Sequence, residues 1–399
     1  MTAELLTGIA ELTTQAAEAG HDNPAEDRLA DAALVIENGR IAWIGPAADA
    51  PAADSVVDVA GRAVLPGWVD THTHLIFAGD RSAEFESRMA GTPYAAGGIA
   101  TTVAATRAAS EADLVANARR LRREAAAQGT TFLETKTGYG LDLAGELRSA
   151  RAAAEVADVV TFLGAHVLPP GVDRRDYLDL VTGPMLAAVA PHVDFIDAFC
   201  EQGAFDVEEC REVLLAGRAA GLGLRLHGNQ LGRGGGVRLA VELGCASVDH
   251  CNHLDDADID ALAGSATVAT LLPACDLSTR MPFPPARRLL DAGAAIALAS
   301  NCNPGTSYTT SMQFCVATAV LQMGLTVREA VWAATRGAAK AVGREHGADA
   351  VGSLRVGGRA DLQVLDAPSV AHLAYRPGVP LTVASWTEGI RTPTRRAVI

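Results

Sequence analysis

The chain has 399 residues, of which 49% are hydrophobic and 20% charged, and its formal net charge is −14. This acidity disfavours binding to nucleic acid and to anionic membranes, and no apolar run is long enough to cross a bilayer. The polar N-terminus has no signal-peptide core and the cysteines form no C-x-x-C pair, so we expect a cytoplasmic protein with free thiols.

The first elements expected in chain order are two strands within residues 33–45, ALVIENGRIAWIG, joined by a turn at Asn38-Gly39. Asn-Gly between apolar runs is a strong hairpin signal. Residues 353–366, SLRVGGRADLQVLD, have a similar pattern near the other end of the chain. We therefore expect a small β-sandwich domain built from both termini, residues 1–62 and 350–399.

Between these flanks, short apolar runs alternate with helical segments rich in Ala, Leu and Arg. The expected strands are residues 63–69, 130–134, 158–163, 194–199, 222–226, 245–249, 267–272 and 295–299. Strands that alternate with helices pair in parallel, and eight such units close a (β/α)8 TIM barrel. We expect this α/β barrel to span residues 63–349, with a doubly wound sheet as the alternative.

Histidines follow several of these runs closely. The first run leads into His72 and His74, the third into His166, the fifth into His227 and the sixth into His250. The carboxyl ends of barrel strands meet at one mouth, where active sites lie. The five histidines are therefore expected to converge, although a histidine after a strand is often only a hydrogen-bonded loop residue.

The spacing of His72 and His74 predicts a metal site. Side chains two apart in an extended segment point to the same side, so both can bind one ion. His227 would add a third imidazole, and three imidazoles suit Zn²⁺ or Fe. A metal with an open coordination position activates water and polarises a carbonyl. His250, with Asp249 beside it in sequence, is the candidate base that moves the proton to the leaving nitrogen.

Other reaction classes find little support in the sequence. It contains no nucleophile elbow and no Gly-rich phosphate loop, which disfavours covalent serine chemistry and nucleotide binding. Cys302 lies near the predicted site, but we expect a buried, inert thiol there rather than a nucleophile.

Several segments resemble known families. PGWVDTHTH (66–74) and GSLRVGGRADLQVLD (352–366) are similar to the amidohydrolase superfamily, which joins a metal-binding barrel to a small β domain. More specific segments resemble the imidazolonepropionase family: FAGDRSAEFESRMAGTPY (77–94), GGIATTVAATRAAS (97–110), ETKTGYGLDL (134–143), TFLGAHVLPP (161–170) and NPGTS (303–307). The resemblance runs from about residue 60 to about residue 365.

The resemblance implies hydrolysis of 4-imidazolone-5-propanoate to N-formimino-L-glutamate in histidine breakdown. It implies a single divalent ion, Zn²⁺ or Fe, held by His72, His74, His227 and the residue at position 301. Lys136 lies within ETKTGYG, which is similar to mononuclear members. The family resemblance also suggests a homodimer.

The same resemblance assigns residues to the substrate. The implied substrate-binding residues are Arg81, Tyr139, His166, Asn303, Gly305 and Thr306. Arg81 and the 303–306 loop would bind the propionate carboxylate, and the others would surround the ring together with Gln230, which is also a candidate catalytic residue. Arginine suits this task because its guanidinium binds a carboxylate through two parallel hydrogen bonds. A surface salt bridge is the alternative role for Arg81.

The sequence departs from the family pattern at two positions. The family usually has an acidic residue two positions after the strand-5 histidine, where this chain has Asn229. Its neighbour Gln230 keeps the amide found in many members. At the end of strand 8 the family has an Asp that binds the metal and accepts a proton, whereas this chain has Asn301. An amide offers a carbonyl oxygen but cannot accept a proton at ordinary pH, so Asn301 is both a candidate metal ligand and a candidate cause of slow turnover, whether the replacement is natural or engineered.

Three functions are compatible with these observations. The first is an imidazolonepropionase, with full or impaired activity. The second is another hydrolase or deaminase of cyclic amides or amidines, because this barrel supports many reactions. The third is a binding protein that keeps the pocket but has lost turnover. Arg81 and NPGTS favour a substrate with a short carboxylate tail and therefore the first function.

Overall fold

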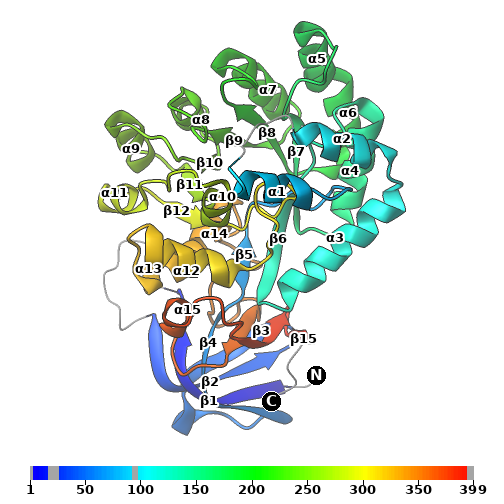
Figure 1. Ribbon diagram of the computed structural model, residues 1–399. Coiled ribbons are helices and arrows are strands. Elements are labelled where there is room, and N and C mark those ends of the chain that lie inside the picture. Colours follow the sequence, from blue (N-terminus) through cyan, green and yellow to red (C-terminus); the bar gives the residue numbers. More distant parts are fainter. Residues whose placement is uncertain (1–2, 17–26, 92–97, 393–399) are drawn as a thin grey trace. The chain divides into compact units, whose positions relative to one another are not determined.

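A computed structural model describes residues 3–16, 27–91 and 98–392 (Figure 1). Parts of two segments used in the family resemblance, residues 92–94 and Gly97, lie outside the described residues. The chain forms two compact units, one of Met1–Asp70, Arg123–Phe132 and Ser311–Ile399, the other of Thr71–Arg122 and Leu133–Thr310. The domain boundaries expected from the sequence, at residues 62 and 350, stay a prediction.

The strands from the two ends of the chain form one sheet. Its order within the described ranges is β15-β14-β13-β4-β1-β2-β3, and β1 pairs in parallel with β4 while its other pairs are antiparallel. The bounds are β1 Ala3–Thr13, β2 Arg28–Glu37, β3 Arg40–Pro46, β4 Ser55–Pro66, β13 Leu362–Leu365, β14 Thr382–Thr387 and β15 Ile390–Thr392. The expected β domain from both termini is confirmed as this sheet.

The predicted hairpin and the predicted C-terminal β segment have different outcomes. Asn38 and Gly39 have φ values of 52° and 78° and join β2 to β3, as a two-residue turn with two left-handed positions requires. In residues 353–366, however, only Leu362–Leu365 is a strand. Gly357 has a φ of 80° and forms part of a turn, which interrupts the extended pattern that the sequence suggested.

The second sheet is the predicted barrel. Its order in the described part of the chain is β12-β11-β10-β9-β8-β7-β6-β5, in agreement with the eight expected runs. The bounds are β5 Trp68–Asp70, β6 Thr130–Lys136, β7 Val159–Ala165, β8 Phe195–Cys200, β9 Gly223–Gly228, β10 Ser247–His250, β11 Val268–Leu271 and β12 Ile296–Leu298. Just past β5 and β12, Thr73 and Cys302 form a parallel bridge and the His74 N–H donates to the Cys302 carbonyl at 2.9 Å. These contacts close the sheet and exclude a doubly wound arrangement.

The first expected barrel strand, residues 63–69, was wrong in its first half. Residues 63–66 end β4 in the terminal sheet, where Pro66 pairs with Leu362, and the barrel strand begins only at Trp68. Gly67 lies between the two strands, and its N–H donates to the Asp361 carbonyl at 3.0 Å. An apolar run does not reveal that a chain changes sheets within it, since both sheets bury the same kinds of side chain.

Helices follow the barrel strands along the chain. They are α1 Ser82–Met89, α2 Ile99–Ala108, α3 Glu111–Ala126, α4 Leu143–Ala154, α5 Arg174–Leu180, α6 Leu186–Val189, α7 Val207–Ala219, α8 Gly236–Glu242, α9 Asp256–Ala263, α10 Pro273–Thr279 and α11 Ala286–Asp291. Later helices are α12 Met312–Gln322, α13 Val327–Ala333, α14 Arg336–Ala341 and α15 His372–Tyr375. Capping boxes begin α7, at Asp206 and Glu209, and α9, at Asp255 and Asp258. Their side chains accept hydrogen bonds from N–H groups that would otherwise be unpaired at the start of the helix.

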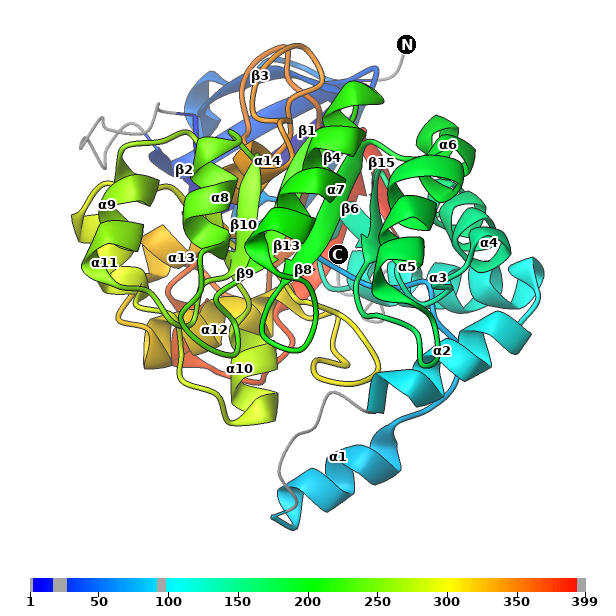
Figure 2. The ribbon, with the colours of Figure 1, turned by 90° about the horizontal axis from the view of Figure 1, so that it is seen from above.

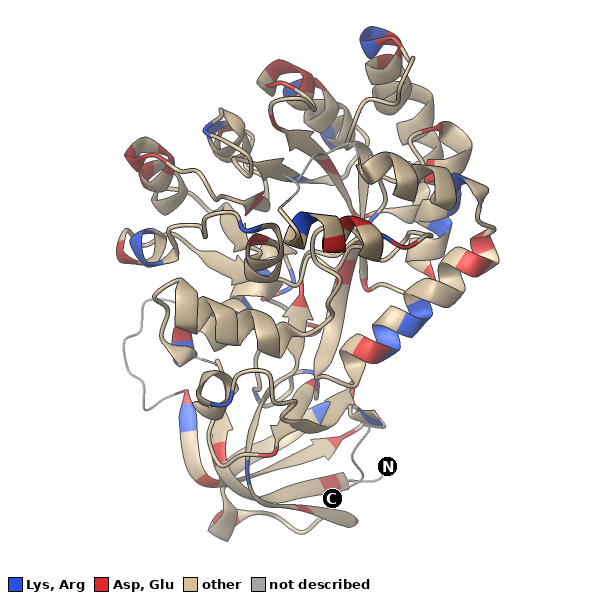
Figure 3. Cartoon of the chain, in the orientation of Figure 1, with Lys and Arg blue, Asp and Glu red and all other residues tan. Residues whose placement is uncertain are grey.

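Helices α7, α8, α9 and α11 lie outside strands β8–β12 (Figures 1 and 2). Strands β10, β11 and β12 are buried along their whole length, which explains their continuous apolar runs. Charges of both signs lie on these outer helices (Figure 3), as in the pair Arg287–Asp291 at 2.9 Å on α11. No helix among the described residues is long and apolar enough to span a membrane.

Candidate active site

The carboxyl ends of the barrel strands surround a cavity within the unit formed by Thr71–Arg122 and Leu133–Thr310. Its lining residues are His74, Arg81, Ile99, Tyr139, His166, Val167, Phe199, His227, Gln230, His250, Asn301, Asn303 and Thr306. The structure thus gathers nearly all the predicted site residues around one space. Of the others, His72 is fully buried in contact with the lining histidines, and Gly305 lies directly against the Arg81 guanidinium.

Several strand ends at this cavity have left-handed backbone. Positive φ values occur at Asn229 (56°), His250 (85°), Cys251 (58°) and Asn301 (50°). Each such position costs on the order of 1 kcal/mol or more for a residue other than glycine, and such strain clusters at functional sites. At His250 the unusual φ also breaks the alternation of the strand, so His250 and its neighbour Asp249 both contact the histidine cluster.

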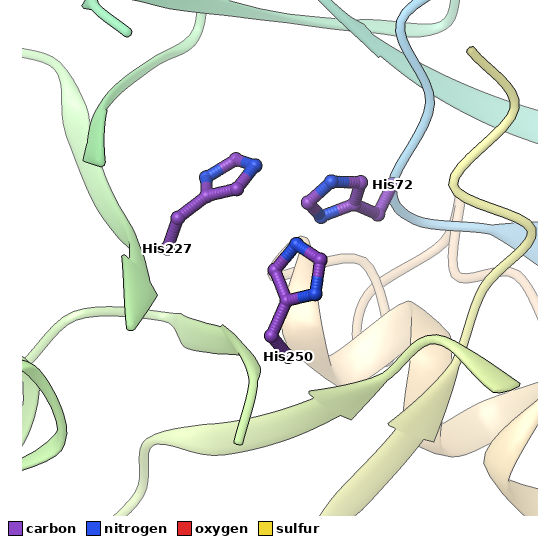
Figure 4. A group of neighbouring side chains, drawn as sticks. All are labelled: His72, His227 and His250. Carbon is purple, nitrogen blue, oxygen red and sulfur yellow. The ribbon is translucent and has the colours of Figure 1, made fainter. Parts of the chain in front are cut away.

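The imidazole rings of His72, His74, His227 and His250 form a compact cluster. His72 Nε2 and His74 Nε2 are 3.2 Å apart, and the His72 and His227 ring centroids are 4.7 Å apart. One ligand atom from each of His72, His227 and His250 lies within 4.8 Å of the other two (Figure 4). The sequence placed His74 rather than His250 in the first set of ligands; the structure places both beside His72.

Carboxylates contact the outer nitrogens of two of these histidines. His72 Nδ1 is 2.7 Å from Asp249 Oδ2, and His227 Nδ1 is 2.9 Å from Asp197 Oδ2. A carboxylate behind an imidazole fixes the tautomer in which the other nitrogen presents its lone pair, which is the usual arrangement behind metal-binding histidines. The residues present therefore fit a metal ion, and the barrel holds a metal-binding group of histidines.

Burial keeps His72, His74, His166 and His250 neutral. It lowers the pKa of His72 and of His74 well below the ordinary value, with neighbouring positive charge as a further cause. Burial likewise lowers the pKa of His166 to about 4 and that of His250 to about 3. A neutral imidazole is the form that binds a metal or accepts a proton, so the site holds these four histidines in the reactive form.

A buried network of charges lies beside the histidines. Lys136 Nζ is 3.0 Å from Glu134 and 3.1 Å from Asp197, and Arg225 Nη2 is 3.1 Å from Asp249. All five side chains are fully buried. The network ties the two carboxylates that contact His72 and His227 to fixed positive charges. Removing one partner from such a network leaves an uncompensated buried charge, which is strongly unfavourable.

Sequence reasoning missed Asp197 and Arg225. Both lie inside runs interpreted as apolar strands, DFIDAF and LGLRL. A charged residue inside a strand that is otherwise buried was the available signal, because such charges are rare unless paired. The sequence also associated Asp249 with His250, its neighbour, whereas the Asp249 carboxylate bonds to His72, to Ser247 at 2.6 Å and to Arg225.

Arg81 lines the cavity and also forms an ion pair. Its Nε and Nη2 lie 2.8 Å and 2.7 Å from the two carboxylate oxygens of Glu84. The salt bridge considered as the alternative role is therefore present, but it is not a surface one, since the Arg81 side chain is only 5% exposed. Because Arg81 lines the cavity, it can keep its ion pair with Glu84 and also contact a carboxylate bound there.

The NPGT loop is organised by Asn303. Its Oδ1 accepts from the backbone N–H groups of Gly305 (2.9 Å) and Thr306 (2.8 Å), and its Nδ2 donates to the Asn301 carbonyl (2.7 Å) and to Asn301 Oδ1 (3.2 Å). The Arg88 guanidinium donates to the Gly305 carbonyl at 2.8 Å. Asn303 thus shapes the loop that it shares with Thr306 and also orients the Asn301 amide.

The remaining predicted residues also have defined places. His166 Nδ1 is 2.9 Å from the Gly138 carbonyl, and its ring stacks on His74 and lies 5.5 Å from the Tyr139 ring. Gln230 lines the cavity, whereas Asn229 is buried beside it and donates to the His253 carbonyl at 3.0 Å. Cys302 is fully buried and does not line the cavity, as expected for an inert thiol.

Comparisons with known proteins agree with this geometry. The family model described as "Amidohydrolase family" matches residues 175–378. Imidazolonepropionase from Saccharopolyspora erythraea is 67% identical over 99% of this chain and 100% of the relative, and that from Streptomyces coelicolor is 57% identical over 97% and 98%. A zinc-bound adenosine deaminase structure from Xanthomonas campestris has a TM-score of 0.72 and 19% identity, covering 99% of this chain and 94% of its own. The chain therefore belongs to the imidazolonepropionases of the amidohydrolase family.

Proposed function

We propose that this chain hydrolyses 4-imidazolone-5-propanoate to N-formimino-L-glutamate, a step in histidine breakdown. The observation that carries the proposal is that one cavity is lined both by histidines of the cluster and by an arginine, Arg81. The histidines suit hydrolysis of a cyclic amide, and the arginine suits a short carboxylate tail. The relatives named above support the same reaction.

We infer that the site binds one divalent ion, Zn²⁺ or Fe, through His72, His74, His227 and the amide oxygen of Asn301. When bound, such an ion lowers the pKa of a water molecule and polarises a carbonyl. The neutral imidazoles of His72 and His74 supply lone pairs, and Asp249 and Asp197 keep the rings of His72 and His227 in the required orientation.

The other side chains bind and orient the substrate. Arg81, with the loop that contains Asn303 and Thr306, would bind the propionate carboxylate. Tyr139 and His166, whose rings are 5.5 Å apart, would pack against the imidazolone ring, and Gln230 would donate to or accept from its polar edge. A ring fixed in this way presents its carbonyl to the histidine cluster in one orientation, which lowers the entropic part of the barrier.

His250 is the proposed proton carrier. Its neutral imidazole would accept a proton from the attacking water and return it to the ring nitrogen that leaves as the C–N bond breaks. Asn301 has the shape of the family's Asp but cannot accept this proton. We therefore expect slow turnover. If turnover were lost completely, the chain would be a binding protein that keeps the pocket.

The proposal is tested by a hydrolysis assay with 4-imidazolone-5-propanoate run beside elemental analysis of the same sample. We expect N-formimino-L-glutamate as the product, formed slowly by this chain and faster after Asn301→Asp. A metal-loaded Asn301→Asp protein that forms no product would contradict the proposed substrate. Cyclic amides that lack the carboxylate would then be tested as substrates of a hydrolase or deaminase. The presence of Arg81 argues against such substrates. The expected homodimer stays a prediction.

A further inference from the structure

The histidines of the cluster differ in what contacts their outer nitrogens. Asp249 and Asp197 lie within 3 Å of Nδ1 of His72 and His227, respectively, at 2.7 Å and 2.9 Å. His250 has the same inward orientation: Figure 4 shows its Nε2 directed toward the other two rings, with Nδ1 on the far side. Among the described residues, the buried Nδ1 atoms of His74, His227 and His250 make no hydrogen bond, but that of His227 still faces Asp197 at 2.9 Å. His250 therefore lacks the facing carboxylate that His72 and His227 have.

A buried carboxylate with an open oxygen lies next to His250. Asp276, on helix α10 (Pro273–Thr279), has 1% exposure, and its Oδ1 accepts from Asn252 Nδ2 at 2.7 Å. Its Oδ2 has no partner among the residues that the structure describes. One ligand atom from each of His250, Cys275 and Asp276 lies within 4.8 Å of the other two. Two buried side chains that each carry an unsatisfied polar atom are thus neighbours, and leaving both atoms unpaired is costly.

We propose that Asp276 is the positioning residue for His250: its Oδ2 accepts a hydrogen bond from Nδ1–H of His250 and holds Nε2 as the proton acceptor at the cavity. This inference rests on the proposed function, in which His250 carries the proton. A neutral imidazole has a proton on one nitrogen only, and a carboxylate at one side decides which. Without it, the tautomer with Nε2–H would be populated, and that form cannot accept a proton at Nε2.

The surrounding contacts favour Asp276 over other partners. Asp249, adjacent to His250 in sequence, is already engaged by His72, Ser247 and Arg225. Asn252 lies on the loop directly after His250 and ties Asp276 to that loop, because its Nδ2 donates to both Asp276 and the Pro282 carbonyl at 2.7 Å. The proposed bond needs a side-chain adjustment at Asp276 or His250, while the Asn252 contacts keep the two elements together.

The same three residues also have the composition of a metal site, which is the competing interpretation. Burial raises the pKa of the Cys275 thiol to about 12, so the thiol is neutral. A thiol binds a metal as the thiolate, and burial opposes its formation here. Burial also raises the pKa of Asp276 to about 7, and a hydrogen bond from His250 would favour its ionised form. A hydrogen bond between His250 Nδ1 and Asp276 Oδ2 gives each of these atoms a partner without any added ion.

The test is Asp276→Asn, which keeps the shape and removes the charge. The imidazole nitrogen chemical shifts of His250, assigned by comparison with His250→Gln, report the tautomer directly. We expect Nδ1–H in the parent and a substantial Nε2–H population in the variant. We also expect kcat to fall by roughly 10–100-fold, the usual scale for losing such a partner, with KM and metal content unchanged. Asp258→Asn is the control, since Asp258 is buried on α9 and pairs with Arg238, so it should affect stability but neither tautomer nor kcat.

The outcomes separate this inference from the proposed function. If neither the parent nor Asn301→Asp hydrolyses the imidazolone, the proposed function fails, and the tautomer measurement still decides the role of Asp276. An unchanged His250 tautomer in Asp276→Asn would overturn the inference. So would elemental analysis that finds two metal ions per parent chain and one in Asp276→Asn, because Asp276 would then be a ligand.

Discussion

Arg81 and Glu84 form a two-point ion pair at the cavity, with Nε–Oε2 and Nη2–Oε1 distances of 2.8 Å and 2.7 Å. Arg81 is nearly buried, whereas the Glu84 side chain is 29% exposed. Glu84 therefore fixes the plane of the guanidinium beside Asn303 and Thr306 and compensates part of its charge. A cation held in this way is preorganised for a carboxylate that enters the cavity.

Arg81→Met should weaken binding of imidazolone-propionate or its analogues by about 2–5 kcal/mol, the range expected when a desolvated charge loses its partner. Calorimetric titration would measure this loss. An ester or amide of the propionate tail should bind less tightly than the acid in the parent, but should lose much less in the variant. Equal losses in both proteins would mean that Arg81 is not the anchor. Glu84→Gln, which keeps the guanidinium, should cost less than Arg81→Met.

Asn301→Asp should restore turnover by roughly 10²-fold or more, since a positioned proton acceptor contributes on that scale. The added negative charge faces neutral imidazoles, so metal affinity should also rise. Ligand affinity should change little, because Arg81, Tyr139 and His166 do not depend on this charge. Steady-state kinetics and metal competition would measure the two effects. If the parent already turns over at a typical enzyme rate of ~1–10³ per second and Asp adds nothing, His250 is the base to test next.

The fully loaded protein should contain about one metal ion per chain, because the proposed ligands form a single cluster. A carboxylated lysine could bridge a second ion, but the Lys136 amine is held by Glu134 and Asp197 at 3.0 Å and 3.1 Å. Carboxylation would place a negative group against these carboxylates. Elemental analysis after metal loading measures the ratio, and two ions per chain would contradict a mononuclear centre.

Lys136→Met should destabilise the fold by about 3–5 kcal/mol, because it leaves buried carboxylates without their cation. The midpoint of urea unfolding should fall with little change in the slope. Lys340, partly exposed on α14, is the matched control, and Lys340→Met should change stability by less than about 1 kcal/mol. Similar effects at the two positions would show that the buried network contributes little.

Stability of the metal-free protein should fall as the pH decreases from about 6.5 toward 4. Burial lowers the pKa of His166 to about 4, so the folded state keeps this imidazole neutral while the unfolded chain takes up a proton below its ordinary pKa. Each such histidine contributes a slope of at most about 1.4 kcal/mol per pH unit in this window. His166→Gln should flatten the dependence measured by urea unfolding, whereas His346→Gln, at a side chain 79% exposed, should not.

The sequence by itself determined the local features of this protein. Apolar runs located the barrel strands because parallel strands are buried on both faces, and the Asn38-Gly39 hairpin followed from the backbone that such a turn requires. The spacing of His72 and His74 indicated a shared direction for their side chains. Resemblance in segments such as ETKTGYG and NPGTS pointed to candidate substrate residues, among them Tyr139, Asn303 and Thr306, which line the cavity.

Tertiary structure alone decided which groups meet across the barrel. Asp249 is 177 positions from His72, and Asp197 contacts both His227 and Lys136 from different strands. Periodicity gives the direction of a side chain on its own element, but closure of the sheet selects its partner on another. The left-handed backbone at His250 breaks even the local pattern. For this reason the proximity of Asp276 to His250 emerged only when β10 and α10 were placed side by side in the folded barrel.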